Sequence, residues 1–595
     1  MTKLNRIVPL GLLLAGILLP CLLCAGPRER NVLVIPVEFK DITFTYSTDN
    51  LEAFLNERDF SFEGATGSVS RYFGDQFGDS LTLRFQMTPT VSLSRERAYY
   101  GEDNAFGEDS RPDEMVREAC TSLDEVLDFS VFDNDSTGCV QHLLFIYAGE
   151  DEALGGPAEC LWSQCWSLKD LGQKLKLDNT TIDIFACTSE LGDDGKLSGI
   201  GRFCHETLHT MGLPDFYDSY IPAEKAYYSA ALWGFTSIMD GGWRNNGGRT
   251  PPCLNAVERF ILGTGSRSEL KSGANHLSPI GESRAYAAID CPQEGECFLF
   301  ECRSQNGWDR FIGGSGMLVY HLDKTGNDIG EYKGRKLSAR GLWDYNLVNI
   351  FPGHQCVDLV EASGKEDRIF RNRTISEEDL PDIFFPVGGT ALGPYTNPAL
   401  KSWYSGGLGL SVNLVTAAPS GGINLVLGEE TTVIDRIEIF QDAAIVNWTC
   451  KQEGNCSIQL DSNDASIVAP AEGSSFSFLF ENLAPGASYT VTIIDSEGYI
   501  IKQTFTTRSW DKKSRPRILT DSFPKDSQGF VKAGSRIPLR IENAPGEKIR
   551  WYADGTPIVP EADGKVTIER SVVLKARIYR MDNAAITIVK ELKVK

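Results

Sequence analysis

Two histidines and a glutamate lie together in the segment His205-Glu206-Thr207-Leu208-His209. In a helix, residues four positions apart project from the same face, so His205 and His209 can bind one metal ion together. A catalytic zinc ion needs three protein ligands and keeps one position open for water. Glu206 can take a proton from that water as it attacks a peptide carbonyl. The pattern predicts a hydrolytic zinc site with Glu206 as general base; the alternative is a solvated helix with two surface histidines.

The residues after this motif supply candidates for the third ligand. Gly212 suits a sharp helix end because glycine tolerates a positive φ. Asp215 follows six residues after His209, the spacing at which metzincin-type enzymes place a third ligand, so Asp215 is the predicted zinc ligand. The main alternative is Glu224, which thermolysin-like enzymes would place on a second helix. The remaining alternatives are Asp218 and Asp240.

Three neighbouring residues have supporting or structural interpretations. Met239, within Thr236-Ser237-Ile238-Met239-Asp240, resembles the methionine turn beneath the metal of such enzymes; the alternative is a core methionine. Cys204 points about a hundred degrees away from His205 around the helix, so we expect it in the core. Tyr217 either stabilises an oxyanion or packs beneath Asp215, and packing is the favoured interpretation.

The residues around the motif resemble the immune inhibitor A family of metallopeptidases. Residues 203–218 (FCHETLHTMGLPDFYD) are similar to the family's site, and the likeness extends to Ser68–Leu83, Trp233–Gly242 and Glu301–Asp323. It covers most of residues 31 to about 427. The resemblance implies a zincin-type catalytic domain and a secreted zinc endopeptidase, often stabilised by calcium. The family often carries a pro-segment, for which this sequence leaves no room after the leader.

A second metal site is predicted at Asp133-Asn134-Asp135-Ser136-Thr137-Gly138. The segment alternates oxygen-bearing side chains and ends at a glycine, as calcium loops do, which makes Asp133 and Asp135 candidate calcium ligands. Thr137 and Gln141 stand where further acids are expected. The alternative is an acidic surface turn.

The composition is that of a folded protein of several domains. The chain has 595 residues, of which 42% are hydrophobic, and a formal net charge of -23. A chain of this length exceeds one core. No basic stripe is present, which argues against nucleic-acid or anionic-membrane binding.

The first 26 residues predict a signal peptide. Lys3 and Arg6 precede an apolar run from Ile7 to Leu23, and the small residues Ala25 and Gly26 follow. This order is typical of an exported protein, so we expect a secreted or cell-surface (extracellular or periplasmic) location. The alternatives are a retained membrane anchor and lipid attachment at Cys24. No second run of membrane-spanning length occurs.

The segment from residue 27 to 428 is predicted as an α/β (α+β) catalytic domain. The expected strands are Asn31–Phe39, His142–Tyr147 and Thr181–Ala186, and the expected helices are Asn50–Asn56, Asp113–Val126 and one from beyond Ser198 to about Met211. The last of these carries the zinc motif.

Two all-β sandwich domains are predicted after it, at residues 429–509 and 510–595. Expected strands are Ile437–Trp448, Ser475–Leu483 and Ser488–Ile494. The first domain resembles fibronectin type III, with Trp448 in the core and Tyr489 making the corner hydrogen bond. The second resembles an immunoglobulin domain at Trp551-Tyr552-Ala553-Asp554-Gly555.

Of 15 cysteines, Cys21 and Cys24 belong to the leader. Export permits disulfides, and the predicted hairpin pairs are Cys291 with Cys297 and Cys450 with Cys456, with Cys160 and Cys165 as a further candidate. His321 and Asp323 are expected to form structural hydrogen bonds rather than a second metal site.

The sequence therefore predicts a zinc endopeptidase that cleaves extracellular proteins, with modules that act as spacers or attach the enzyme to a surface. One alternative is a non-catalytic adhesin on a peptidase scaffold, against which the intact Glu206 argues. The other is a zinc hydrolase that acts on glycan or lipid.

Overall fold

The computed structural model describes residues 29–104, 107–217, 219, 234–351, 353–364, 380–394, 396–419, 421–429, 432–451, 453–461, 465–470, 473–496, 499–509, 516–520, 523–542, 548–579 and 585–595. The predicted leader with Cys24, and the alternative ligands Asp218 and Glu224, lie outside these residues. Within them, we find no helix with the length and apolar character needed to span a membrane. The chain divides into two compact units, with the main boundary between Leu427 and Gly428.

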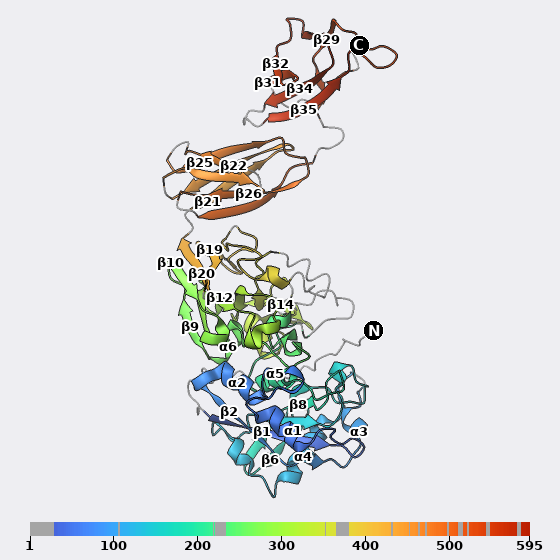
Figure 1. The fold of residues 1–595 in the computed structure, drawn as a ribbon, viewed down its shortest axis with the longest axis vertical. Coiled ribbons are helices and arrows are strands. Elements are labelled where there is room, and N and C mark those ends of the chain that lie inside the picture. The colour runs from blue at the N-terminus through green and yellow to red at the C-terminus, as the bar shows by residue number, and fades with distance from the viewer. Residues whose placement is uncertain are drawn as a thin grey trace. The chain divides into compact units, whose positions relative to one another are not determined.

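The first unit begins with a sheet in the strand order β2-β1-β4-β8-β5, and β3 also pairs with β1 (Figure 1). The strands are β1 (Glu29–Glu38), β2 (Thr82–Met87), β3 (Val91–Ser92), β4 (Leu143–Tyr147), β5 (Gln164–Ser167) and β8 (Ile184–Ser189). All pairs are parallel except that of β5 with β8, which is antiparallel. An antiparallel strand therefore forms one edge of an otherwise parallel sheet.

Helices cover both faces of this sheet. Strand β1 is a continuous apolar run because it is buried on both faces: Val32 and Val34 face one core and Leu33 and Ile35 the other, all with no exposed surface. The first core includes α1 (Thr48–Asn56), α2 (Val69–Phe77) and α5 (Ile200–Thr210); the second includes α3 (Arg97–Gly101) and α4 (Pro112–Leu123). The small hairpin β6 (Leu175–Leu177) and β7 (Thr180–Ile182) precedes β8. The predicted strand Thr181–Ala186 is therefore wrong: it covers the end of β7 and the start of β8, and the chain leaves the hairpin at Asp183 between them.

Two more sheets complete the first unit. One has the order β16-β13-β12-β11-β9 and the other β10-β20-β19. Their bounds are β9 (Ser266–Glu269), β10 (Gly273–Leu277), β11 (Ala285–Asp290), β12 (Glu296–Arg303), β13 (Gly316–Asp323), β16 (Val357–Leu359), β19 (Leu410–Ala417) and β20 (Ile423–Glu429). Smaller elements are α6 (Ala256–Leu262), α7 (Ile280–Ser283), α8 (Ala339–Asp344), β14 (Asp328–Tyr332), β15 (Arg335–Ser338), β17 (Lys401–Ser402) and β18 (Gly406–Gly407).

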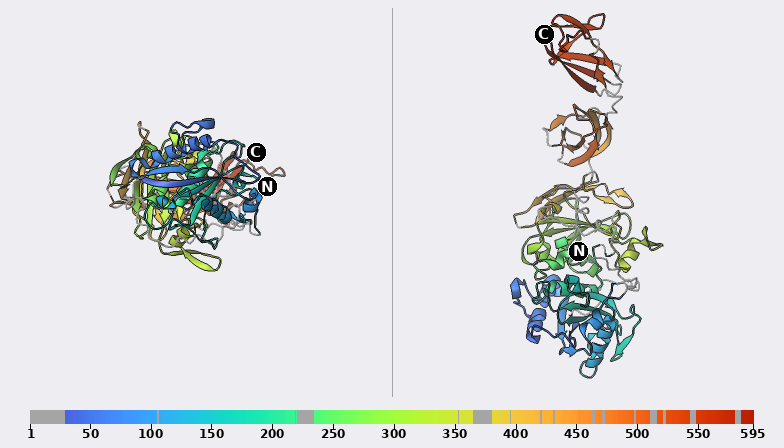
Figure 2. Two further views of the ribbon diagram at one scale, coloured as in Figure 1. Left: turned by 90° about the horizontal axis from the view of Figure 1, so that it is seen from below. Right: turned by 90° about the vertical axis from the view of Figure 1, so that its right-hand side faces the viewer.

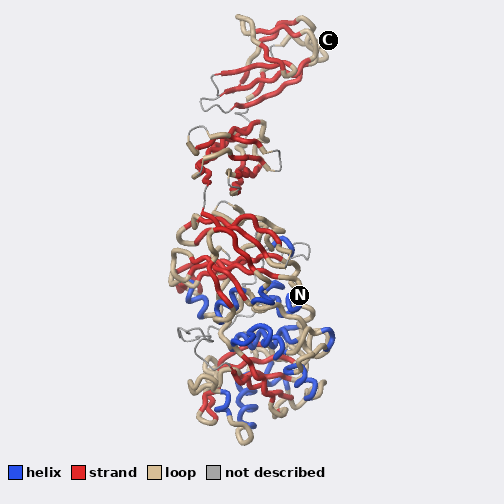
Figure 3. Tube along the Cα trace, turned by 60° about the vertical axis from the view of Figure 1, so that its left-hand side comes forward, coloured by secondary structure: helices blue, strands red, loops and turns tan. Residues whose placement is uncertain are grey.

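The helix α5 lies between the first sheet and the second. One core contains Val34 of β1, Phe203 and Leu208 of α5, and Leu299 and Leu318 of β12 and β13. Figure 3 shows helices between two layers of strands in this part of the chain. The predicted α/β class of the catalytic domain is confirmed, and the helix that carries the zinc motif is buried in the middle of it.

The second unit is all β, as predicted. Its first module has a three-stranded sheet β21-β22-β25 and a four-stranded sheet β24-β23-β26-β27, drawn in orange in Figures 1 and 2. The strands are β21 (Thr432–Ile439), β22 (Ala443–Cys450), β23 (Cys456–Leu460), β24 (Ser466–Val468), β25 (Ser475–Glu481), β26 (Ser488–Ile494) and β27 (Ile500–Thr506).

Side chains in this module match the fibronectin-like expectation. Trp448 is fully buried and stacks on Phe476 at 5.1 Å between ring centroids. The Tyr489 hydroxyl accepts a hydrogen bond from the Ala484 backbone N–H at 2.7 Å, which is the corner contact. One strand prediction in this module is wrong: residues 437–448 are the end of β21 and most of β22, and the hairpin turns between them at Phe440–Asp442. Only the two polar residues Gln441 and Asp442 interrupt the apolar pattern at this turn.

The last module contains the sheet β32-β31-β34-β35 and two short pairs, β28-β30 and β29-β33. Its strands are β28 (Arg517–Ile518), β29 (Ser535–Pro538), β30 (Ile541–Glu542), β31 (Lys548–Ala553), β32 (Thr556–Ile558), β33 (Lys565–Ile568), β34 (Val572–Tyr579) and β35 (Ala585–Leu592). Trp551 lies in the core, and Asp554-Gly555 forms the turn between β31 and β32.

Candidate active site

The helix α5 presents the His-Glu-x-x-His motif from a buried position. His205 and Glu206 are each 2% exposed. Cys204 has no exposed surface and lies in the core, as predicted. The helix ends where expected, because Gly212 adopts a φ of 92° that favours glycine. The Gly212 N–H donates to the His209 carbonyl at 2.9 Å, and the chain then turns back toward the helix.

Three side-chain atoms converge on one point beside this turn. The Nε2 atoms of His205 and His209 are 3.1 Å apart. Oδ1 of Asp215 lies 3.3 Å from each of them. The structure thus brings together the two histidines and the aspartate of the sequence prediction. Asp240, an alternative ligand, is not in this group among the described residues.

Both imidazoles are oriented by backbone carbonyls. The Nδ1 atom of His205 lies 2.7 Å from the Ile238 oxygen, and Nδ1 of His209 lies 2.7 Å from the Leu213 oxygen. A carbonyl only accepts, so each Nδ1 carries the hydrogen. In the neutral rings both Nε2 atoms are then acceptors. This tautomer and this kind of partner are typical of metal-binding histidines.

The convergence of acceptors fits a metal ion. Three acceptor atoms within 3.3 Å repel one another unless a cation lies among them. Oδ1 of Asp215 is buried and receives no hydrogen bond from the described part of the chain. Tetrahedral ligands at 2.0–2.1 Å from a zinc ion lie about 3.3 Å from one another. Two nitrogens and one carboxylate oxygen at this separation therefore suit zinc.

The close approach of these three groups also shifts the pKa values of Asp215 and His209. Burial opposes ionisation of Asp215, but the neighbouring His209 and His205 hold the pKa of its carboxyl well below the usual range. Burial acts to lower the pKa of His209, yet the Asp215 carboxylate raises it to about 9. The site thus favours positive charge at the point where the three atoms meet.

Glu206 lies on the same helix beside this point. Its Oε1 atom is 3.7 Å from Nη1 of Arg202, one helical turn earlier, and its Oε2 atom is buried without a hydrogen-bond partner among the described residues. Burial raises the pKa of Glu206. The Arg202 guanidinium stacks over Trp243 at 3.7 Å, and Arg244 lies over the same ring at 4.4 Å. Arg202 and Trp243 were not predicted from the sequence.

The segment that contains Met239 packs against the site. Ile238 and Met239 have no exposed surface, and the Met239 carbonyl accepts the N–H of Phe216, next to Asp215, at 2.9 Å. Glu258, whose pKa burial raises to about 7, accepts a hydrogen bond from the Ser237 hydroxyl at 2.6 Å and from the Met239 N–H at 3.3 Å. The carbonyl that orients His205 thus belongs to a turn anchored on α6.

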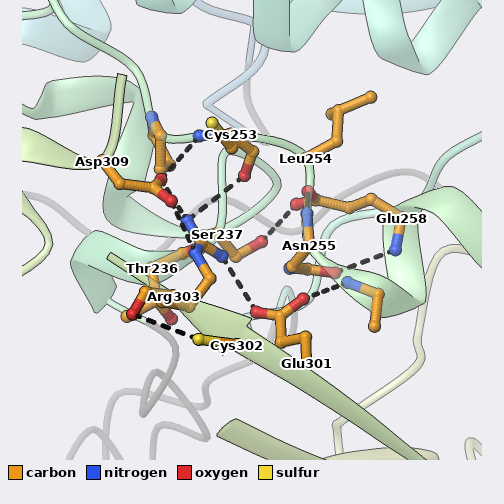
Figure 4. A network of polar contacts seen from close by, with 12 residues as sticks. Thr236, Ser237, Cys253, Leu254, Asn255, Glu258, Glu301, Cys302, Arg303 and Asp309 are labelled. Atoms are coloured by element: carbon orange, nitrogen blue, oxygen red, sulfur yellow. Dashed lines mark hydrogen bonds and ion pairs between the residues drawn. The ribbon is translucent and has the colours of Figure 1, made fainter. Parts of the chain in front are cut away.

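A buried ionic network holds the other end of the same segment (Figure 4). Arg303 donates to the Thr236 carbonyl at 3.1 Å and forms ion pairs with Glu301 and Asp309. Glu301 also accepts the first backbone N–H of α6, from Ala256. Because these charged groups are paired and hydrogen-bonded, their burial is tolerated. The network was not predicted, since its members are distant in the sequence.

Asp215 is held by one further residue that was not predicted. The side-chain amide of Asn346 forms two hydrogen bonds with Asp215, one to its backbone and one to its carboxylate. Tyr217 is close enough that, after burial itself, Asp215 and Glu206 raise the pKa of its hydroxyl well above the ordinary value. Both sequence interpretations of Tyr217, oxyanion stabilisation and packing beneath Asp215, stay predictions.

The edge strand β5 borders the site. Helix α5 packs against β5 and β8, and the carboxylates of Glu206 and Asp215 add to burial in raising the pKa of Cys165 on β5. Among the described strands, β5 pairs only with β8, so its other edge is unpaired. An unpaired edge next to a catalytic centre can take an extended chain.

The predicted calcium loop has an unexpected centre. The Nε2 atom of Gln141 lies 2.6 Å from Asp135 Oδ1, 2.7 Å from the Cys139 carbonyl, 3.1 Å from Thr137 Oγ1 and 3.2 Å from Asp133 Oδ1. An amide nitrogen therefore stands where calcium loops of this spacing hold an ion. The calcium site itself stays a prediction.

Other predicted polar residues form structural contacts. His321 bonds to Glu296 at 2.8 Å, and Asp323 accepts from His354 at 2.8 Å. His321 belongs to a group of possible metal ligands with Cys291 and Glu296. Glu296 is already bonded to Ser402 and to the Trp403 backbone, so structural hydrogen bonds remain the better interpretation.

The structure joins none of the described cysteines by a disulfide. Cys450 and Cys456 lie with their Sγ atoms 3.2 Å apart in the core of the first sandwich. Cys291, Cys297, Cys160 and Cys165 are free thiols in the structure. The three predicted pairs stay predictions.

Comparison with known proteins identifies the region that contains the site. Residues 46–259 match the family model described as Immune inhibitor A peptidase M6, catalytic domain. The predicted resemblance to this family is confirmed. The match contains α5, Asp215 and Met239, whereas Glu301–Asp323, which the sequence likeness also included, lies beyond it.

Two curated relatives carry the same family likeness. The chain is 27% identical over 270 residues to Immune inhibitor A of Bacillus thuringiensis subsp. alesti. It is 26% identical over 273 residues to the pre-pro-metalloprotease PrtV of Vibrio cholerae serotype O1. Each alignment covers 38% of this chain, but only 38% and 28% of the respective relatives.

Solved structures match only loosely. Tandem Ig repeats of Dlar cover 28% of the chain with a TM-score of 0.16 and 13% identity, and 97% of that structure is aligned. Fibronectin(III)-like modules of Clostridium thermocellum CbhA also cover 28% of the chain, with a TM-score of 0.12, 15% identity and 94% of that structure aligned.

Proposed function

Starting from the match to the immune inhibitor A peptidase family and from the three converging acceptor atoms, we propose that this protein is a zinc-dependent endopeptidase. His205, His209 and Asp215 are the proposed ligands, and Glu206 is the proposed general base. The observation that carries the proposal is the meeting of Nε2, Nε2 and Oδ1 within 3.3 Å. Relatives named as metalloproteases support it.

Each residue has a distinct task in this proposal. Bound zinc would supply a water molecule of lowered pKa and polarise the scissile carbonyl. Glu206, which follows the first ligand on α5, takes the proton of the attacking water at its free oxygen and passes it to the leaving amine. The carbonyls of Ile238 and Leu213 keep both imidazoles in the tautomer that leaves Nε2 free.

The proposed substrates are extracellular proteins in an extended conformation. The unpaired edge of β5 can add a substrate strand beside the metal, with backbone hydrogen bonds that do not depend on sequence. Residue preference would come from side-chain pockets along that edge.

The rest of the chain fits export. We propose that residues 1–26 are a signal peptide and that the all-β modules act as spacers or attach the enzyme to a surface. In an oxidising compartment Cys450 and Cys456, already in contact, would form a disulfide with loss of two electrons and two protons to a disulfide-bearing oxidant. A chain ending at Gly428 should still hydrolyse an unstructured protein, because all proposed catalytic groups precede it.

Casein hydrolysis, measured before and after removal of metal by a zinc chelator, tests the proposal. We expect activity to disappear with the metal and to return when zinc is added. Stable zinc binding without hydrolysis would indicate a binding protein instead. Activity that survives complete removal of the metal contradicts the zinc mechanism.

A further inference from the structure

The third proposed ligand depends on a residue that follows another helix. Helix α8 ends at Asp344, and Asn346 comes two residues later with a φ of 54°. The Leu347 N–H returns to the Leu342 carbonyl at 2.9 Å, which closes the helix end. Asparagine tolerates this left-handed conformation better than most residues. Capping alone would explain an asparagine here, but its side chain makes contacts that a cap does not need.

Those contacts form a reciprocal pair with Asp215. The Asp215 backbone N–H donates to Oδ1 of Asn346 at 2.7 Å, and Nδ2 of Asn346 donates to Oδ2 of Asp215 at 2.9 Å. The orientation of the amide is fixed, because a backbone N–H can only donate and so must face the amide oxygen. The amide NH₂ group then faces the carboxylate.

Because of this pair, the two oxygens of the Asp215 carboxylate have different partners. Oδ2 is taken by the amide, and Oδ1 is left 3.3 Å from each imidazole Nε2. We propose that Asn346 is a positioning residue for the metal site, whose amide holds Asp215 so that one carboxylate oxygen faces the metal. This inference rests on the proposed function, in which Asp215 is a ligand.

Neighbouring contacts join the two segments on either side of this pair. The Ser219 hydroxyl donates to the Asn346 carbonyl at 2.7 Å, and Asn349 donates through Nδ2 to the Phe216 carbonyl at 2.8 Å. Asn349 also binds the Val357 backbone, at the start of β16. The segment that follows the zinc helix is therefore held by the segment around residues 346–349.

Asn346 lies well beyond the part of the chain that matches the family model. The family model ends at residue 259, and the Asp215–Asn346 contacts span 131 positions in sequence. A metal site with a correctly held third ligand thus needs residues well beyond the matched catalytic domain. The functional catalytic unit includes α8 and the turn after it.

The test is the zinc affinity of the full-length protein, measured without substrate by competition with a chromophoric chelator. Asn346→Gly removes the amide while glycine keeps the positive φ. We expect zinc affinity to fall 10- to 100-fold, the range seen when partners of metal ligands are removed. Asn179→Gly is the matched control: Asn179 is exposed in the β6–β7 turn and also has a positive φ, 61°. It should leave zinc affinity unchanged.

A second variant separates affinity from stability. Asn346→Ala also lacks the amide but adds the strain of a positive φ at alanine. Its melting temperature should be lower than that of Asn346→Gly, while its zinc affinity should be the same. Zinc affinities that followed the melting temperatures instead would show a general structural role and overturn the inference.

The Asp215→Ala background decides whether Asn346 acts through the ligand. If it does, Asp215→Ala and Asp215→Ala/Asn346→Gly should bind zinc equally weakly, because the amide no longer has a ligand to hold. An equal further loss in the double variant overturns the positioning role, and so does wild-type affinity in Asn346→Gly. If Asp215→Ala alone keeps full affinity, the ligand set of the proposed function fails, which is a distinguishable result.

Discussion

Oxygen and nitrogen acceptor atoms lie close together at two places in the first unit, but only one of these places has a hydrogen-bond donor at its centre. Beside α5, two imidazole nitrogens and a carboxylate oxygen meet within 3.3 Å, and every one of them is an acceptor while both imidazoles are neutral. In the loop before β4, two carboxylates, a hydroxyl and a carbonyl surround the side-chain nitrogen of Gln141 at 2.6–3.2 Å. The first place favours positive charge from outside the chain, as a metal ion or a proton; the second already contains a donor of the chain.

The difference shows how to distinguish a metal site from a loop with similar ligands. Both segments have the residue types and spacings of metal-binding motifs. What separates them is whether any N–H or O–H of the chain points at the centre. The Nε2 atom of Gln141 lies within hydrogen-bond distance of four oxygens, between which its two N–H groups are shared, and its Oε1 accepts the Asn134 backbone N–H. We therefore expect zinc to be essential at α5 and calcium to be dispensable at the loop.

The largest expected effect is at the site without a donor. His205→Ala removes one of the three proposed ligands, and two ligands hold zinc poorly. We expect zinc content and casein hydrolysis both to fall to background, with the all-β unit unaffected. Metal analysis of the purified variant, with circular dichroism as a check on folding, measures this. Stoichiometric zinc in His205→Ala would show that the site beside α5 does not depend on His205 for metal binding, and would contradict the proposed difference between this site and the loop.

Glu206→Gln separates chemistry from binding at the same site. The amide cannot accept the proton, so turnover should fall by at least about 10²-fold, the low end for a positioned general base. Zinc content should stay at the wild-type level, because Glu206 is outside the group of converging ligand atoms. Metal analysis together with the casein assay checks both statements. Turnover near the wild-type value with zinc bound would exclude Glu206 as the base.

The sequence could predict those parts of the site that depend on local geometry. His205 and His209 are one helical turn apart, and Gly212 returns the chain so that Asp215 meets them, as the spacing of metzincin-type enzymes predicts; the alternatives Asp218 and Glu224 lie outside the described residues. Asn346 and Arg303 could not be predicted in this way, because the chain must fold before either reaches the site. The hydrogen bond from His205 to the Ile238 carbonyl was missed for another reason, since a backbone acceptor has no signature in the sequence.

The same distinction holds for the fold. The parallel strands and α5 were predicted from apolar runs and helix-end signals within a few residues. The hairpin between β21 and β22 was missed, because its turn at Phe440–Asp442 interrupts the apolar pattern too briefly. Gln141 was noticed as a missing acid in a calcium loop. That its amide would occupy the centre depends on a side-chain direction, which only coordinates give.

Gln141→Glu should turn the filled loop into one that responds to calcium. The variant replaces the donor by a third carboxylate, which repels Asp133 and Asp135 until a cation neutralises them. Thermal unfolding should show stabilisation by calcium, about 2.7 kcal/mol at a concentration 100-fold above the dissociation constant. Gln141→Glu/Asp135→Asn is the control and should respond less. A wild-type protein stabilised to the same extent, with the effect lost in Asp135→Asn, would show instead that the loop binds calcium.

The smallest expected effect comes from removing the donor without adding charge. Gln141→Met keeps the length of the side chain but leaves Asp133 Oδ1, Asp135 Oδ1 and the Cys139 carbonyl without the Gln141 N–H. The loop is partly exposed, so water can replace part of what is lost, and we expect the free energy of unfolding to fall by only about 1 kcal/mol. Gln293→Met is the matched control, because no hydrogen bond is found for the Gln293 side chain within the described residues. Urea unfolding at a fixed low calcium concentration measures both variants. If Gln141→Met is as stable as Gln293→Met, the Gln141 amide does not stabilise the loop. The proposed difference between the loop and the site beside α5 would then lack support from the loop.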